Sequence, residues 1–119
     1  MDKVNIEEKL DCISEYWKPI IIGELNNQHV KLAKVKGEFV IHKHENEDEL
    51  FLVLKGQLIM DYGEKVDIIN EGEFVIVPKG TYHKPIAKSE THLLLFEPST
   101  TLNTGNVRND FTVDSLERI

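Results

Sequence analysis

One eight-residue stretch, HKHENEDE at residues 42–49, combines two histidines with five charged residues between strongly apolar flanks. In an extended strand, side chains two residues apart point to the same face. His42 and His44 would then lie side by side, with Cβ atoms about 7 Å apart and Lys43 on the opposite face. Two imidazoles on one face can bind the same metal ion, so the spacing predicts part of a metal site.

The third group of this predicted site is Glu49. The residues ENED predict a tight reversal, and Glu49 opens the next apolar run, ELFLVLKG. Because a hairpin returns the chain beside itself, we expect the carboxylate next to the two imidazoles. The alternative is a solvated hairpin tip, since short His-x-His patterns also occur by chance. The stretch alone leaves both interpretations open.

A second stretch, GEFVIVPKGTYH at residues 72–83, ends on another histidine. Its FVIV run is apolar at successive positions, which predicts a strand enclosed by other layers on both faces. Pro78 and Gly80 predict a turn that delivers His83. Taken alone, a histidine in this position is more often a surface residue than a ligand.

Together the two stretches resemble the two signature motifs of the cupin superfamily. The matching positions are glycines, a proline, histidines and a glutamate: Gly37, His42, His44, Glu49 and Gly56 in the first motif, and Gly72, Pro78, Gly80 and His83 in the second. Four residues rather than five separate Gly37 from His42, and Ala87 stands where the family has Asn. The resemblance covers residues 33–98. In detail it is to small single-domain cupins of the YdbB-like group, often labelled after mannose-6-phosphate isomerase.

The resemblance implies an all-β fold, a jelly-roll β-barrel, with its four ligand positions near one mouth. These positions are His42, His44, Glu49 and His83. Three imidazoles and one carboxylate suit a divalent transition metal (Fe, Mn, Ni, Co, Cu or Zn) and leave two positions of an octahedron for substrate, O₂ or water. We expect His29 and His92 to lie outside this metal site.

The remaining sequence predicts one domain over residues 1–119, built from one short helix and many strands. Asn5 and Glu8 form a capping-box pattern, and the periodic apolar residues after them predict an amphipathic helix over about 6–17, ended by Pro19. Short β-rich runs then indicate an antiparallel barrel or sandwich. These runs are KPIIIGEL, HVKLAKVKG, EFVIHKH, ELFLVLKG, QLIMDYG, KVDIIN, EFVIVPKG and THLLLFEP. We expect an ordered tail at 99–119.

Strand parity also predicts the side chains that surround the metal site. Val40, Phe51 and Val53 should point inward, either as pocket wall or as ordinary barrel core. We expect neither Tyr62 nor Tyr82 to be catalytic. The lysines that flank the ligands in sequence, which would suit a sugar phosphate, are Lys43, Lys79 and Lys84.

The amino-acid composition limits the classes of partner that the protein can bind. The net charge of −7 disfavours nucleic acid and anionic membranes as partners. The single cysteine, Cys12, cannot form an intramolecular disulfide, and the N-terminus lacks a secretory pattern, so we expect a cytoplasmic protein. The apolar run KPIIIGEL predicts an edge strand that pairs with a second copy in a homodimer.

The sequence is consistent with two function classes. The first is a metal-dependent enzyme acting on a small polar metabolite, by isomerase or epimerase chemistry or by dioxygenase chemistry. The second is a non-catalytic cupin that binds or stores a small molecule. The second class is favoured by an absence: beyond the four ligand positions and neighbouring acids such as Glu45, Glu47 and Asp48, the sequence displays no obvious buried base, nucleophile or phosphate loop.

Overall fold

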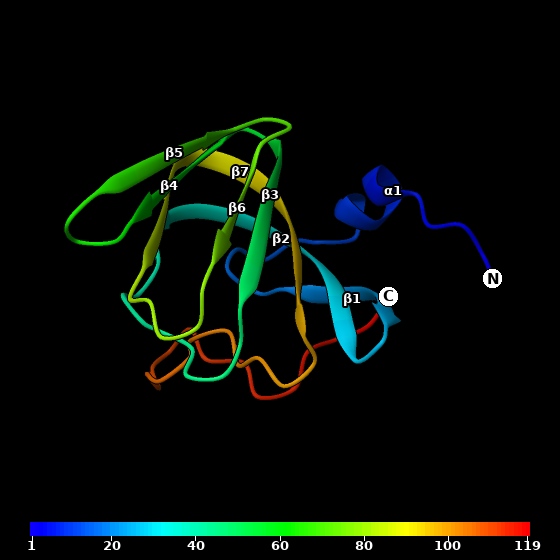
Figure 1. Cartoon of the computed structure of the whole chain (residues 1–119). Coiled ribbons are helices and arrows are strands. Elements are labelled where there is room, and N and C mark those ends of the chain that lie inside the picture. The colour runs from blue at the N-terminus through cyan, green and yellow to red at the C-terminus, as the bar shows by residue number, and fades with distance from the viewer.

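Antiparallel strands that curve around an apolar interior make up most of the chain (Figure 1). The computed structural model describes residues 1–119. Its elements are α1 (Ile6–Asp11), β1 (Ile20–Leu25), β2 (Gln28–Glu38), β3 (Glu49–Lys55), β4 (Gln57–Asp61), β5 (Val66–Asn70), β6 (Phe74–Val77) and β7 (Lys84–Pro98). The prediction of an all-β fold with a short N-terminal helix is confirmed.

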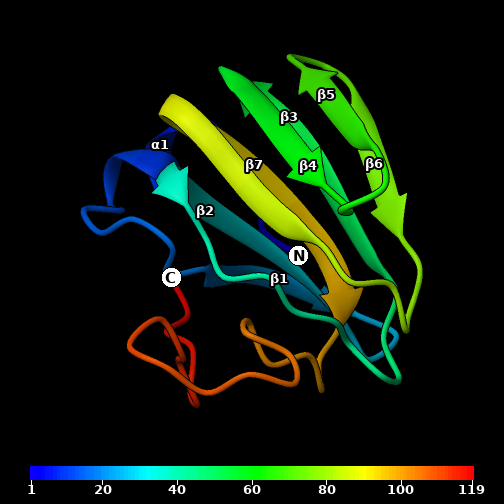
Figure 2. The ribbon, with the colours of Figure 1, turned by 90° about the vertical axis from the view of Figure 1, so that its left-hand side faces the viewer.

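The long strand β7 holds the sheet together. The strand order is β1-β2-β7-β3-β6, and β4 connects β7 to β5. β2 pairs with β7 along almost the whole length of one edge, and on the other edge the first residues of β7 pair with β4 and its later residues with β3. Figure 2 shows β7 running the length of the molecule between β2 and the side formed by β3 and β4. Because β7 spans the fold, it links the strands that carry the candidate site.

The core follows the two-residue period of the strands. Inward-facing residues of β2 to β7 form one cluster: Ala33, Val35, Phe51, Val53, Leu58, Met60, Ile69, Val77, Ala87, Leu93 and Leu95. A smaller cluster, Leu10, Ile13, Ile20 and Leu32, lies where α1 packs on the sheet. Burial of these alternating side chains is the main stabilising contribution to such a fold.

The helix is shorter than predicted. Asn5 caps it as expected, since its side chain accepts a hydrogen bond from Glu8 N at 3.0 Å, but the helix ends at Asp11. Pro19 is therefore not what ends it. Trp17 has a positive φ of 62° and pairs with β2 through its backbone N–H, which donates to Lys34 O at 2.9 Å. Pairing with the sheet overrides the helical periodicity of the sequence.

Two strand predictions were wrong in detail. The run EFVIHKH forms no strand beyond Glu38, and residues 39–48 contain only an isolated bridge at His42. The run FVIV is not enclosed on both faces: β6 pairs only with β3, and Phe74 and Ile76 are 60% and 53% exposed. An apolar run on both faces is typical of a buried strand, yet β6 lies at a sheet edge.

The tail at 99–119 is ordered by contacts with the barrel, although it forms no helix or strand. Its end covers part of the outer edge of β1, because Ile21 N donates to Glu117 O and Ile119 N donates to Ile21 O. In Figure 1 the tail, orange to red, crosses the lower end of the barrel and reaches β1. None of the helical structure is long and apolar enough to span a bilayer.

Gly56 and Gly63 provide a matched test of how closely the turn between β3 and β4 packs against β7. Both have φ of 90°, but a Cβ at Gly56 would lie 2.6 Å from Thr91 Oγ1 and 3.0 Å from Glu90 O, whereas a Cβ at Gly63 meets nothing within 4 Å. Backbone strain should cost about 1–3 kcal/mol in either alanine variant. Overpacking should add about 1–3 kcal/mol in Gly56→Ala alone. Urea unfolding of the two variants measures the difference, and equal loss of stability would contradict the close approach at Gly56.

Candidate metal centre

A short backbone bridge positions two of the predicted ligands. His42 N donates to His83 O at 3.0 Å, and His83 N donates to His42 O at 2.9 Å. Gly80 N donates to His44 O at 2.7 Å, so the turn before His83 is fixed to the segment that carries His44. Glu49 is the first residue of β3 and pairs with Val77 of β6. The two sequence stretches are thereby brought to one place.

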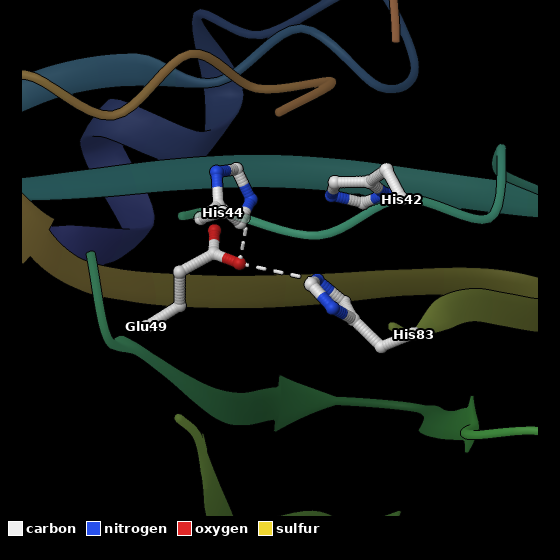
Figure 3. Close-up of side chains that lie close together, drawn as sticks. All are labelled: His42, His44, Glu49 and His83. Carbon is white, nitrogen blue, oxygen red and sulfur yellow. Dashed lines mark ion pairs between the residues drawn. The ribbon is translucent and has the colours of Figure 1, made fainter. Parts of the chain in front are cut away.

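The four side chains His42, His44, Glu49 and His83 converge inside the barrel and are all buried (Figure 3). One ligand atom from each lies within 4.8 Å of the others. Glu49 Oε1 is 2.9 Å from His44 Nε2 and 3.1 Å from His83 Nε2. All three atoms are shielded from solvent, and none has a hydrogen-bond partner. Their only polar contacts are the ion-pair contacts with one another. Buried polar atoms without partners are rare and often mark an ion site.

Backbone carbonyls orient two of the imidazoles. Nδ1 of His42 lies 2.9 Å from Val40 O, and Nδ1 of His83 lies 2.9 Å from Thr81 O. Because a carbonyl only accepts, each Nδ1 must carry the proton, and a neutral ring then has its lone pair on Nε2. At His83 that lone pair faces a carboxylate oxygen. A cation between the two groups makes this arrangement favourable, so the residues fit a metal ion.

The protonation states agree with this fit. Burial, and then the nearby charge of His83, lower the pKa of His42 to about 4, which leaves the ring neutral near pH 7. Burial acts to raise the pKa of Glu49, but the adjacent His44 and His83 imidazoles outweigh it and bring the pKa to about 2. The centre thus offers an ionised carboxylate and a neutral imidazole, as metal ligation requires.

A small apolar cavity of about 50 Å³ adjoins the centre. Its wall includes two of the four side chains, His42 and Glu49, together with aromatic and aliphatic residues: Trp17, Pro19, Ala33, Val35, Phe39, Phe51, Pro85, Leu93, Leu95, Glu97 and Asn103. The space is enough for a few water molecules or for one end of a small ligand. Of the predicted inward residues, Phe51 lines this cavity. Val53 belongs to the core, and Val40 is half-buried outside the cavity wall.

Two buried charged residues near the centre were missed in the sequence. Glu97 lines the cavity, and its Oε1 lies 3.6 Å from Lys31 Nζ, with both side chains nearly inaccessible. Burial, and then the charge of Glu49, raise the pKa of Glu97 to about 8. Strand parity is the signal that could have found them. Lys31 lies on the same face of β2 as Ala33, and Glu97 on the same face of β7 as Leu95.

The tail closes the barrel over the centre. Asn106 Oδ1 accepts a hydrogen bond from Lys43 N at 2.9 Å, and Asn106 N donates to Lys43 O at 3.1 Å. A Cβ on Gly105 would lie 2.2 Å from Lys43 O, so only glycine permits this approach. The Phe111 ring packs 5.1 Å from that of Phe39, a cavity wall residue. Nothing in the sequence indicated that the tail would contact the metal-ligand segment.

The other residues considered in the sequence lie outside the cluster. His92 is paired with Glu90 at 2.7 Å, and His29 is buried in β2. The flanking lysines do not line the cavity. Lys43 is paired with Glu45, Lys84 with Glu38, and Lys79 is exposed. Tyr82 is half-exposed, Tyr62 packs against the core, and Ala87, at the position where cupins have Asn, is fully buried.

Comparisons with known proteins agree with this geometry. The family described as "Cupin domain" matches residues 28–97. The protein YdbB of Bacillus subtilis (strain 168) is 39% identical over 64 residues, which span 53% of this chain and only 57% of YdbB.

Two solved structures are also similar. A cupin-2 domain containing protein from Shewanella frigidimarina NCIMB 400 has a TM-score of 0.79 and 38% identity, and the match covers 80% of this chain and 93% of that one. The protein NMB1881 of Neisseria meningitidis has a TM-score of 0.76 and 30% identity, with 82% and 100% covered. The jelly-roll fold and the family match point to one conclusion: this chain belongs to the cupin family and carries a buried three-histidine, one-glutamate cluster that can hold a metal ion.

Proposed function

We propose that this cupin binds one divalent transition metal through His42, His44, Glu49 and His83 and acts as a metal-dependent enzyme on a small polar metabolite. The observation that carries the proposal is the set of unpartnered Nε2 and carboxylate atoms that converge beside a cavity. A structural site would be closed on all sides. A cavity against the ligands leaves space for a substrate to reach the metal.

A metal in this centre would act as a Lewis acid toward a carbonyl, or as the site of O₂ chemistry if it is iron. The protein's own contribution is to shield the reaction from water and to orient the ligand. Trp17 and Phe39 in the cavity wall, with Phe111 packed against both rings, exclude water. Glu97 is the carboxyl group in the cavity wall that is not one of the proposed ligands, and its raised pKa suits proton transfer near neutral pH.

The surroundings of the centre favour an uncharged substrate. No lysine or arginine lines the cavity, and Glu45 and Glu47 lie beside His44 in a neighbouring surface hollow. Carboxylates close to a site repel anions that approach it. A sugar phosphate therefore finds little support, in spite of the lysines close by in the sequence.

The second candidate is a non-catalytic cupin that binds or stores a small molecule. The small size of the cavity favours it, because about 50 Å³ holds only part of a metabolite. In that case the metal would anchor the ligand without turning it over. The two candidates share the metal site and differ in what happens to the bound molecule.

Metal binding is the first test of the proposal. Purified without a histidine tag and reconstituted anaerobically, the protein should contain about one transition metal per chain. His44→Ala should weaken metal binding by about tenfold or more while the circular dichroism spectrum stays nearly unchanged, because the apolar core dominates folding. His92→Ala and His29→Ala are the matched controls and should keep the metal. Absence of metal in the wild type, or loss in either control, would refute the site.

Turnover assays distinguish the chemistries. With Fe(II) and O₂, a dioxygenase should consume oxygen with catechol, thiol or diketone substrates, and Glu49→Gln should change the rate by altering the charge at the metal. An isomerase should work without O₂, accept several divalent metals and exchange solvent deuterium into its product.

A binding cupin should give neither signal. It should instead gain thermal stability from its ligand, by about 2.7 kcal/mol at a hundredfold excess over Kd. A ligand-induced shift without turnover in any metal form would favour the second candidate.

We also propose a homodimer. β1 is an edge strand, and the part beyond Ile21, residues 22–25, has backbone groups free on its outer side for pairing with a second copy. The edge is shorter than the sequence suggested because the tail occupies it at Ile21. Sedimentation equilibrium should give twice the chain mass of 13.7 kDa. A stable species of 13.7 kDa at micromolar concentration would contradict the dimer.

A further inference from the structure

A second cavity, of about 330 Å³, lies between β1, β2 and the tail. It shares no wall residue with the cavity beside the metal centre. The tail that encloses it is the orange and red segment of Figure 1. Its wall is mainly polar and contains cationic side chains, which sets it apart from the apolar metal cavity.

The most buried charge in this wall is Lys31. Its side chain is 3% exposed, and its closest carboxylate oxygen, Glu97 Oε1, is 3.6 Å away, too far for a hydrogen bond. An ammonium group has three N–H donors, and a buried charge without hydrogen bonds is costly. Lys31 therefore has donor capacity that Glu97, at 3.6 Å, does not satisfy.

A second cation, Arg118, extends over the same cavity. Its Nη2 donates to Glu24 Oε1 at 3.0 Å, and a guanidinium group has further donors in a planar fork. The one carboxylate in the wall, Asp114, is held by Arg108 at 2.7 Å. The wall thus contains two cations, and its one carboxylate is already paired with an arginine outside the wall.

Neutral donors complete the wall. His29 is buried, and its Nδ1 has no hydrogen-bond partner. Burial, and then the charge of Lys31, lower the pKa of His29, so the ring is neutral near pH 7 and can donate one hydrogen bond. The hydroxyl groups of Ser99 and Ser115 also line the space. Cations combined with neutral donors are the groups that proteins use to bind oxyanions.

We propose that this cavity binds a small oxyanion, a phosphate or carboxylate group, held by Lys31 and Arg118. The charge of the whole chain is −7, so long-range attraction does not bring anions to it. Binding must come from local contacts with these donors. The site is separate from the proposed metal centre and does not depend on the metal being bound.

Calorimetric titration with inorganic phosphate and, separately, with succinate tests the site at constant ionic strength. Wild type should bind at least one of them, and the tighter of the two identifies the anion class. Lys31→Met and Arg118→Gln should each weaken binding by about tenfold or more, since each removes charge-assisted hydrogen bonds. Lys65→Met removes a cation outside the wall and should bind the anion like wild type.

The His44→Ala variant tests whether the anion binds in this cavity or at the proposed metal centre. Because His44 lies outside the cavity wall, this variant should bind the anion as tightly as wild type does. Arg118 is 60% exposed, so its variant keeps the test valid even if Lys31→Met unfolds because Glu97 loses its partner. No binding of either anion up to millimolar concentration would overturn the proposal. So would unchanged binding in Arg118→Gln, or loss of binding in His44→Ala.

Discussion

The pair of backbone hydrogen bonds between His42 and His83 is the constraint on which the candidate site depends. Residues 39–48 have no strand to hold them, and this bridge, with the bond from Gly80 N to His44 O, fixes the segment against the turn before His83. The two rings then lie 4.3 Å apart. Ligands that are 41 positions apart in the chain are held by backbone contacts and not by packing of the ligands themselves. Rigid backbone support of this kind preorganises a metal site.

The centre combines burial with polarity in a way that a bound cation would make favourable. His44, Glu49 and His83 present unpartnered atoms to one another inside an apolar barrel. Each would ordinarily destabilise the fold, because buried polar groups without hydrogen bonds carry their full desolvation cost. The surrounding core of eleven buried apolar residues stabilises the fold and offsets that cost. Because the apolar core stabilises the strands, the four polar side chains can be arranged for ligand binding without having to stabilise the fold.

Side-chain alternation and short-range turns were the features that the sequence predicted well. Parity placed Phe51 and Val53 inside, and the Pro78 turn brought His83 to the cluster. Contacts between residues far apart in the chain could not be predicted from the sequence. Trp17 leaves the helical pattern because β2 offers a hydrogen-bond partner, and Phe74 is exposed because no strand or helix packs over β6. Lys31 and Glu97 were missed because lysine and glutamate are rarely buried, and each alone looks like a surface residue.

The Lys31 and Glu97 pair separates two environments within one small barrel. On the Glu97 side the wall is apolar and meets the metal centre, and on the Lys31 side it is polar and open to the tail. Ion pairs in low dielectric are weak contributors to stability, since desolvation of both partners offsets their attraction. Two apolar residues would fill the same volume with less penalty. The pair is better explained by what each member offers to its own cavity, a carboxyl group beside the candidate metal centre and an ammonium group facing the polar space.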